Sequence, residues 1–174
     1  ACANVCPVDA ITMKPDDFGF LYPEVDHQLC IQCQKCEKVC DFIKPKQRDI
    51  MPIKSYAAVH KDASVLGKSS SGGVFYALAE YVLSCNGAVC GCVYDDALNV
   101  MHICVEEKNA LVSMQKSKYV QSNVGFVYRQ VKERLDKGQM ILFTGTPCQV
   151  DGLYRYLGER PENLITCDLV CHGV

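Results

Sequence analysis

The chain has 174 residues, of which 49% are hydrophobic, and its formal net charge is −2. This length is enough for one ordinary domain or two small ones, and the hydrophobic share is enough for a core. The chain has no basic block, which argues against nucleic acid as a partner. It also has no apolar run long enough to span a membrane.

The thirteen cysteines are the most unusual feature of the composition. In a small secreted protein such a number predicts disulfides. Here the number is odd and the cysteines come in short-spaced groups, which is typical of metal ligands in a reducing compartment. We therefore expect a cytoplasmic protein that uses several of its cysteines to bind metal.

The chain opens with ACANVCP, and residues 30–41 read CIQCQKCEKVCD. In the spacing C-x2-C-x2-C-x3-C, three cysteines hold one 4Fe-4S cluster and the fourth serves a neighbouring cluster. One cluster would then use Cys6, Cys30, Cys33 and Cys36, and the second would use Cys2 and Cys40. Because the second cluster needs two more ligands, we expect the chain to be a fragment that begins inside its first motif.

A zinc site is the alternative, but zinc motifs usually place two cysteine pairs a dozen or more residues apart. Pro7 after Cys6 agrees with the ferredoxin pattern, whereas Asp41 stands where a proline would follow Cys40. Between the two motifs the sequence predicts short strands and turns, with Pro23 as punctuation. Residues 1–45 thus resemble a two-cluster bacterial-type ferredoxin and predict an α+β iron–sulfur domain.

Residues 46–54 carry prolines and charges and are interpreted as a linker. The remainder, residues 55–174, alternates strands with helices, which predicts an α/β domain with a largely parallel or mixed sheet. The expected strands are 56–60, 88–95, 100–105, 139–145 and 163–173, and the expected helices lie within 71–86, 124–138 and 146–157.

Ser71, in the serine-rich turn before the first of these helices, is expected to be the N-cap of that helix. The unpaired backbone N–H groups at such a helix N-terminus can bind a phosphate. Lys116 and Lys118 could neutralise a diphosphate there. The alternatives stay open: an ordinary capped helix, and a solvated pair of lysines.

The later cysteines fall into two groups. Cys85, Cys90, Cys92 and Cys104 are interpreted mainly as small buried hydrophobes. Cys148 differs, because Thr146 suits an N-cap and Pro147 the first helical position, so that the helix dipole favours a thiolate at Cys148. Parallel strands would bring Cys171 to the same edge of the sheet, whereas Cys167 is assigned to the core.

Four segments together resemble the coenzyme F-420 hydrogenase/dehydrogenase beta-subunit family, in the subtype with an N-terminal ferredoxin domain. They are SSSGGVFYALAEYVL, KSKYVQSN, LFTGTPCQVDGL and CDLVCHGV. The resemblance implies an FAD-binding α/β domain, and a further cluster with Cys148 and Cys171 as two ligands and the others beyond Val174. The resemblance also implies that the serine-rich turn, the segment KSKYVQSN and the start of the TGTPCQ segment bind FAD. The residues concerned are Ser70, Ser71, Gly72, Gly73, Lys116, Lys118, Asn123 and Thr146.

The leading hypothesis is an iron–sulfur flavoprotein oxidoreductase that passes electrons between 4Fe-4S clusters, FAD and a two-electron carrier or substrate such as coenzyme F-420. This fragment alone is expected to be inactive. One alternative is a ferredoxin-like electron-carrier module that docks a partner without its own catalysis. Another is an enzyme with Cys148 as nucleophile and His172 as base. The expected partner is a redox protein or a small-molecule electron carrier, and the oligomeric state stays open.

Overall fold

The computed structural model describes residues 1–43 and 54–171. The chain divides near residue 50 into two compact units, with residues 151–159 grouped with the first. Each unit is described here by itself. Most of the predicted linker, residues 46–53, lies outside the described residues, as does His172.

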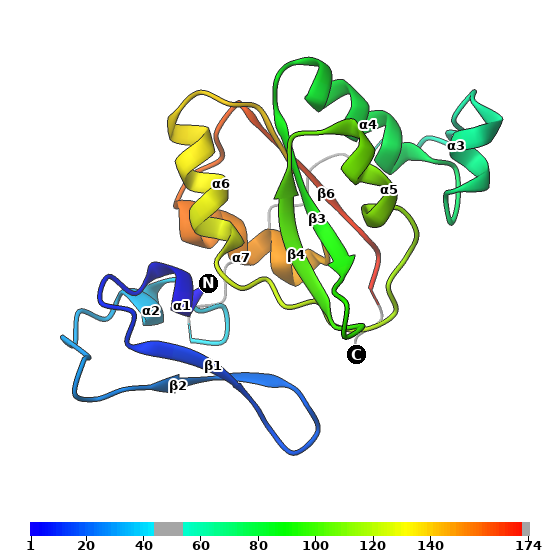
Figure 1. Cartoon of the computed structure of the whole chain (residues 1–174). Helices are drawn as coiled ribbons and strands as arrows, with labels where there is room; N and C mark the ends of the chain where they lie inside the picture. The colour runs from blue at the N-terminus through cyan, green and yellow to red at the C-terminus, as the bar shows by residue number, and fades with distance from the viewer. Residues whose placement is uncertain (44–53, 172–174) are drawn as a thin grey trace. The chain divides into compact units, whose positions relative to one another are not determined.

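The N-terminal unit consists of two short helices and one hairpin (Figure 1). Its elements are α1 (Cys2–Val5), β1 (Ile11–Pro15), β2 (Leu21–Val25) and α2 (Lys35–Lys38). The strands are antiparallel, with Ile11 opposite Val25. The hairpin turns at Asp16, whose Oδ1 accepts the N–H groups of Phe18 and Phe20 at 3.0 and 2.8 Å. Pro23, expected as punctuation, instead lies inside β2, which a two-stranded sheet tolerates.

The second unit is built on a four-stranded sheet in the order β4-β3-β5-β6. The edge strand β4 is antiparallel to β3, and the other pairs are parallel, so the predicted α/β class with a mixed sheet is confirmed. The strands are β3 (Ala88–Tyr94), β4 (Val100–Val105), β5 (Ile141–Gly145) and β6 (Leu164–Asp168). The helices of this unit are α3 (Ala63–Gly67), α4 (Val74–Ser84), η1 (Lys108–Ala110), α5 (Leu111–Met114) and α6 (Val127–Asp136). A further helix, α7 (Pro147–Leu157), begins in this unit and ends in the residues grouped with the first.

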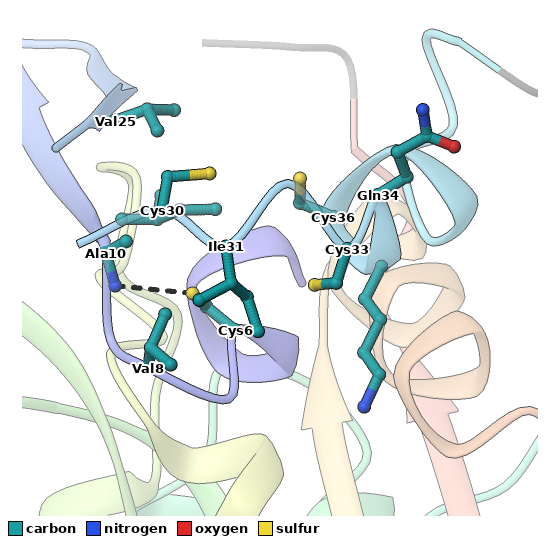
Figure 2. A pocket seen from close by; sticks show the side chains of 11 residues that line it. Cys6, Val8, Ala10, Val25, Cys30, Ile31, Cys33, Gln34 and Cys36 are labelled. Carbon is teal, nitrogen blue, oxygen red and sulfur yellow. Dashed lines mark hydrogen bonds between the residues drawn. The ribbon is translucent and has the colours of Figure 1, made fainter. Parts of the chain in front are cut away.

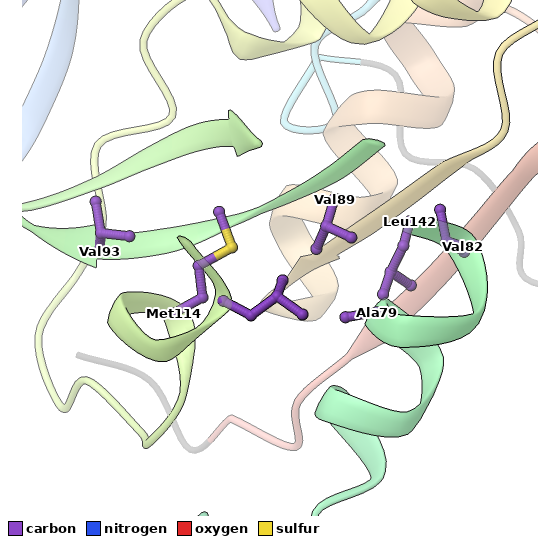
Figure 3. Packing of buried hydrophobic residues seen from close by; sticks show 7 residues of the cluster. Ala79, Val82, Val89, Val93, Met114 and Leu142 are labelled. Carbon is purple, nitrogen blue, oxygen red and sulfur yellow. The ribbon is translucent and has the colours of Figure 1, made fainter. Parts of the chain in front are cut away.

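Helices cover both faces of this sheet (Figure 1). On one face, α4 and α5 pack against the middle strands in a hydrophobic cluster, shown in Figure 3. Its members are Ala79, Val82, Val89, Val93, Leu111, Met114 and Leu142. On the other face, Tyr128 of α6 packs against Phe143 of β5, with ring centroids 5.8 Å apart. No helix in the described part of the chain is long and apolar enough to cross a membrane.

Two expectations for the start of this unit are wrong. Residues 56–60 do not form a strand. Instead, the His60 N–H donates to Gly72 O at 2.7 Å, so this segment lies against the turn before α4. The N-cap of α4 is Gly73, at a φ of 75°, and not Ser71. Glycine suits this place because the left-handed region is strained for residues with a side chain.

Candidate functional site

Four cysteines of the N-terminal unit line one pocket, which Figure 2 shows from close by. They are Cys6, Cys30, Cys33 and Cys36, the four predicted ligands of one cluster. The rest of the lining is mainly apolar and consists of Val8, Ala10, Ile11, Val25, Ile31, Gln34 and Lys35. The fold therefore places cysteines from two separate segments of the sequence around one pocket.

The backbone of the second segment turns so that its cysteines share this pocket. Cys6 directly follows α1, Cys30 and Cys33 lie on the loop that leads from β2 into α2, and Cys36 lies in α2 itself. Gln32 and Gln34, between these cysteines, have φ angles of 55° and 57°. Residues with side chains adopt this left-handed conformation uncommonly, and such positions are often functional. Here they reverse the chain around the pocket.

A backbone hydrogen bond reaches one of the four sulfur atoms. The Ala10 N–H donates to Cys6 Sγ at 3.3 Å (Figure 2). Ala10 is 2% exposed, so this bond is sheltered from water. Hydrogen bonds to ligand sulfurs are among the factors that set the reduction potential of an iron–sulfur cluster.

The chemistry of the donor set fits an iron–sulfur cluster. Four cysteines are the usual ligands of a 4Fe-4S cluster. Burial raises the pKa of the half-buried Cys36 thiol, and a bound metal would hold it deprotonated. Within the described residues, no three His, Cys, Asp or Glu side chains are gathered closely enough to hold a metal ion.

The two cysteines predicted for a second cluster lie outside this pocket. Cys2 is the first residue of α1, and Cys40 follows α2 closely, with its N–H donating to Glu37 O at 3.3 Å. Both are half-buried, and α1 and α2 pack together. The assignment of Cys2 and Cys40 to a second cluster stays a prediction.

In the α/β unit, the serine-rich turn is joined to the loop after α5. The Ser117 N–H donates to Ser70 Oγ at 2.9 Å, and Gln115 Nε2 donates to Ser69 Oγ at 3.4 Å. Two of the segments predicted to hold a diphosphate therefore lie side by side. Gln115 is 6% exposed, and its Oε1 has no hydrogen-bond partner among the described residues.

The two predicted lysines of this loop have different surroundings. Lys118 Nζ donates to four successive carbonyl oxygens, those of residues 113–116, at 2.9 to 3.2 Å. Its ammonium therefore caps the C-terminal end of α5, which the sequence did not reveal. Lys116 is exposed, and no hydrogen bond or ion pair of its ammonium is found among the described residues.

The remaining predicted residues of the site lie near the start of α7. Gln149 Oε1 accepts the Thr146 N–H at 2.9 Å, and Gln149 Nε2 donates to Ser122 Oγ at 2.9 Å. The first bond is half of a capping box, and the T-x-x-Q pattern of residues 146–149 could have revealed it. The second ties the loop that carries Asn123 to the helix, so the loop 115–123 connects the serine-rich turn with the start of α7.

The structure keeps Cys148 and Cys167 in different surroundings. Cys148 is exposed in the first turn of α7, as predicted, and its Sγ lies 3.1 Å from Thr146 Oγ1. Cys167 packs against the core cluster, also as predicted, and burial raises the pKa of its thiol. Cys171 is exposed beyond the end of β6. Because β5 and β6 are parallel, Cys148 and Cys171 both follow strand ends at one edge of the sheet.

The interpretation of the other cysteines as buried hydrophobes needs correction. Cys90 and Cys104 form a disulfide, with Cα atoms 4.0 Å apart, because the antiparallel register of β3 and β4 places them directly opposite each other. Cys85 is exposed after the last residue of α4. Cys92 is half-buried, and burial raises the pKa of its thiol.

Comparison with known proteins agrees with the cysteine pocket. A family model described as a 4Fe-4S dicluster domain matches residues 1–42. A ferredoxin of Alicyclobacillus acidocaldarius subsp. acidocaldarius is 39% identical over 51 residues, which are 29% of this chain and 59% of the relative. A protein named ferredoxin 7Fe, from Hydrogenibacillus schlegelii, is 34% identical over 64 residues, which are 36% of this chain and 76% of the relative.

The pocket and these matches define an iron–sulfur protein whose N-terminal region is an electron-carrying domain that binds 4Fe-4S clusters. Through this region the chain belongs to the ferredoxin family. The family match covers residues 1–42, so the resemblance of the α/β unit to the coenzyme F-420 hydrogenase/dehydrogenase beta subunits stays a prediction.

The close packing of the serine-rich turn leads to a stability prediction for Gly72→Ala. A Cβ atom at Gly72 would lie 2.2 Å from Ala58 O, which is backbone. We expect the substitution to lower the free energy of unfolding by about 1–3 kcal/mol, measured by urea unfolding followed by circular dichroism. In the control Gly67→Ala, the new Cβ would meet nothing within 4 Å, and stability should not fall. Equal midpoints for the two variants would contradict the described packing.

Proposed function

We propose that the protein is an iron–sulfur oxidoreductase in which Cys6, Cys30, Cys33 and Cys36 hold one 4Fe-4S cluster. The observation that carries this proposal is the single pocket lined by these four cysteines. When bound, such a cluster takes up and releases one electron at a time. The family match to a dicluster domain supports the same chemistry.

The residues of the pocket have separable tasks in this proposal. The four thiolates bind iron, and the buried side chain of Ile11 limits the access of water on one side of the pocket. The Ala10 N–H withdraws negative charge from Cys6 Sγ. Hydrogen bonding and solvent exposure together set the potential at which a cluster is reduced.

Replacement of one pocket cysteine tests this ligand set. In the anaerobically reconstituted full-length protein, Cys33→Ala should lower the iron content by about one to four irons and remove the electron paramagnetic resonance signal of one reduced 4Fe-4S cluster. Cys85→Ala is the matched control, because Cys85 is exposed and lies in the other unit. Unchanged iron and unchanged spectra in Cys33→Ala would refute the assignment.

The second part of the proposal is a flavin site in the α/β unit. Its support is the hydrogen bond that joins Ser70 to Ser117, because it places the serine-rich turn beside the loop that carries Lys116. The first N–H groups of α4 have no side-chain cap, and a helix N-terminus favours a phosphate. When bound, FAD would exchange single electrons with a cluster and electron pairs with a carrier such as coenzyme F-420.

The described contacts narrow the choice of residues for the diphosphate. The ammonium of Lys118 is occupied by carbonyl oxygens, so Lys116 is the better charge partner. Ser70 and Ser71 are exposed and could donate hydroxyl hydrogen bonds. Gly72 and Gly73 keep the turn close-packed, and Asn123 and Thr146 lie where the loop 115–123 meets α7. The buried Gln115 Oε1 could accept a hydrogen bond from a ligand donor.

Flavin titration tests this placement. Loss of a charge-assisted contact in Lys116→Ala should weaken FAD binding to the full-length protein by about 1.5 kcal/mol, or about tenfold. Lys132→Ala is the matched control, because Lys132 pairs with Asp136 on the surface of α6. Wild-type affinity in Lys116→Ala, or the absence of any flavin binding, would refute the flavin site without affecting the proposed cluster.

The further cluster with Cys148 and Cys171 stays a prediction. Its support is the parallel pairing of β5 and β6, which brings the segments after both strands to one edge of the sheet. Cys148 also lies in the first turn of α7, where the helix dipole favours a thiolate. The alternative with His172 as a base involves a residue outside the described ranges.

A further inference from the structure

Asp26 lies directly after β2, between the two segments that supply cysteines to the pocket. None of its atoms is among the pocket lining. It is nevertheless connected by hydrogen bonds to the segments of two of the four cysteines.

The first connection runs from Asp26 to Cys6. The Asp26 N–H donates to Ala10 O at 2.8 Å, which adds one more backbone bond beyond the end of the hairpin. The N–H of the same Ala10 donates to Cys6 Sγ at 3.3 Å. The position of the Ala10 amide relative to this sulfur is therefore linked to the backbone of Asp26.

The second connection runs from Asp26 to Cys30. Asp26 Oδ1 accepts the N–H groups of Gln28 and Leu29, at 2.8 and 3.4 Å. Asp26 O accepts the Cys30 N–H at 3.0 Å. The side chain thus closes a turn whose last residue is a cysteine of the pocket, as aspartate commonly does in such turns.

The same chain contains a close counterpart without a cysteine. Asp16 Oδ1 accepts the N–H groups of Phe18 and Phe20 at the tip of the hairpin. Asp16 and Asp26 are therefore similar in their local chemistry and in their exposure. They differ in what their turns carry, because only the turn of Asp26 ends at Cys30 and is bonded to Ala10.

We propose that Asp26 is a positioning residue for the iron–sulfur cluster. Its carboxylate oxygen fixes the turn that presents Cys30, and its backbone keeps Ala10 in place to donate to Cys6 Sγ. Loss of this oxygen would loosen the turn that presents Cys30, weaken the retention of iron and change the electronic environment of the cluster, whereas the backbone bond to Ala10 O would remain. The inference rests on the proposed ligand set. Asp26 would affect the cluster through Cys30 and Ala10, and it would not itself contact iron.

The role of the oxygen can be separated from the role of the charge. Asp26→Asn removes the negative charge but keeps an oxygen in the same place. Asp26→Glu keeps the charge but moves the oxygen outward by one methylene group, and Asp26→Ala removes both. If the position of the oxygen matters, Asp26→Asn should retain iron as the wild type does, whereas Asp26→Glu should lose iron as readily as Asp26→Ala.

The experiment measures the reconstituted full-length protein under anaerobic conditions, with Asp16→Ala as the matched control. The readouts are the rate of iron release to an excess of a ferrous chelator and the electron paramagnetic resonance spectrum of the reduced cluster. Loss of two hydrogen bonds predicts about fivefold to thirtyfold faster release in Asp26→Ala and Asp26→Glu, with altered spectra. Asp26→Asn and Asp16→Ala should release iron at the wild-type rate with unchanged spectra.

The outcomes distinguish this inference from the ligand assignment. If Asp26→Ala and Asp26→Glu match Asp16→Ala, while Cys33→Ala loses its cluster, the positioning role is wrong and the ligand set stands. If Asp26→Asn is as fast as Asp26→Ala, the charge and not the oxygen is responsible, and the proposal is overturned. If Cys33→Ala retains its cluster, the ligand set itself fails. Because the Asn variant keeps both hydrogen bonds, it tests the proposal even if Asp26→Ala does not fold.

Discussion

The register of the hairpin β1–β2 is the constraint on which the cysteine pocket depends. Cys6 precedes the hairpin and the other three cysteines follow it, so the chain must return to its starting point for all four thiols to meet. The pairing of Ile11 with Val25 and the bond from the Asp26 N–H to Ala10 O bring the two ends together. A slip of one residue would turn the side chains of one strand to the opposite face and separate the two groups of cysteines.

A comparable constraint organises the α/β unit. There, the loop 115–123 is held at one end by Ser70 and at the other by Gln149. In between, Asn123 pairs with β4, because its N–H donates to Val100 O and its carbonyl accepts the His102 N–H. The loop therefore links the turn before α4 with the start of α7 through backbone and side-chain bonds. This arrangement supports the proposed flavin site, because the exposed Lys116 is adjacent to Ser117, whose N–H donates to Ser70 in the turn before α4.

The sequence predicted those features that repeat a known spacing. The cysteine motif predicted the pocket, and the alternation of segments predicted a helix within residues 124–138, where α6 lies. The prediction from sequence was wrong for residues 56–60, whose apolar residues are typical of a strand. In the structure the His60 N–H donates to Gly72 O, and the segment lies against the turn before α4. The cap that the Lys118 ammonium forms on α5 depends on the path of the following loop. The disulfide between Cys90 and Cys104 depends on the register of β3 and β4. Residue types alone specify neither.

The most direct test of the account is to locate iron in crystals of the anaerobically reconstituted protein by anomalous scattering at the iron absorption edge. The account predicts a cluster in the pocket beside β2, bound by Cys6, Cys30, Cys33 and Cys36, with the Ala10 N–H directed at Cys6 Sγ. Iron bound by another set of cysteines, with this pocket filled by side chains or water, would contradict it.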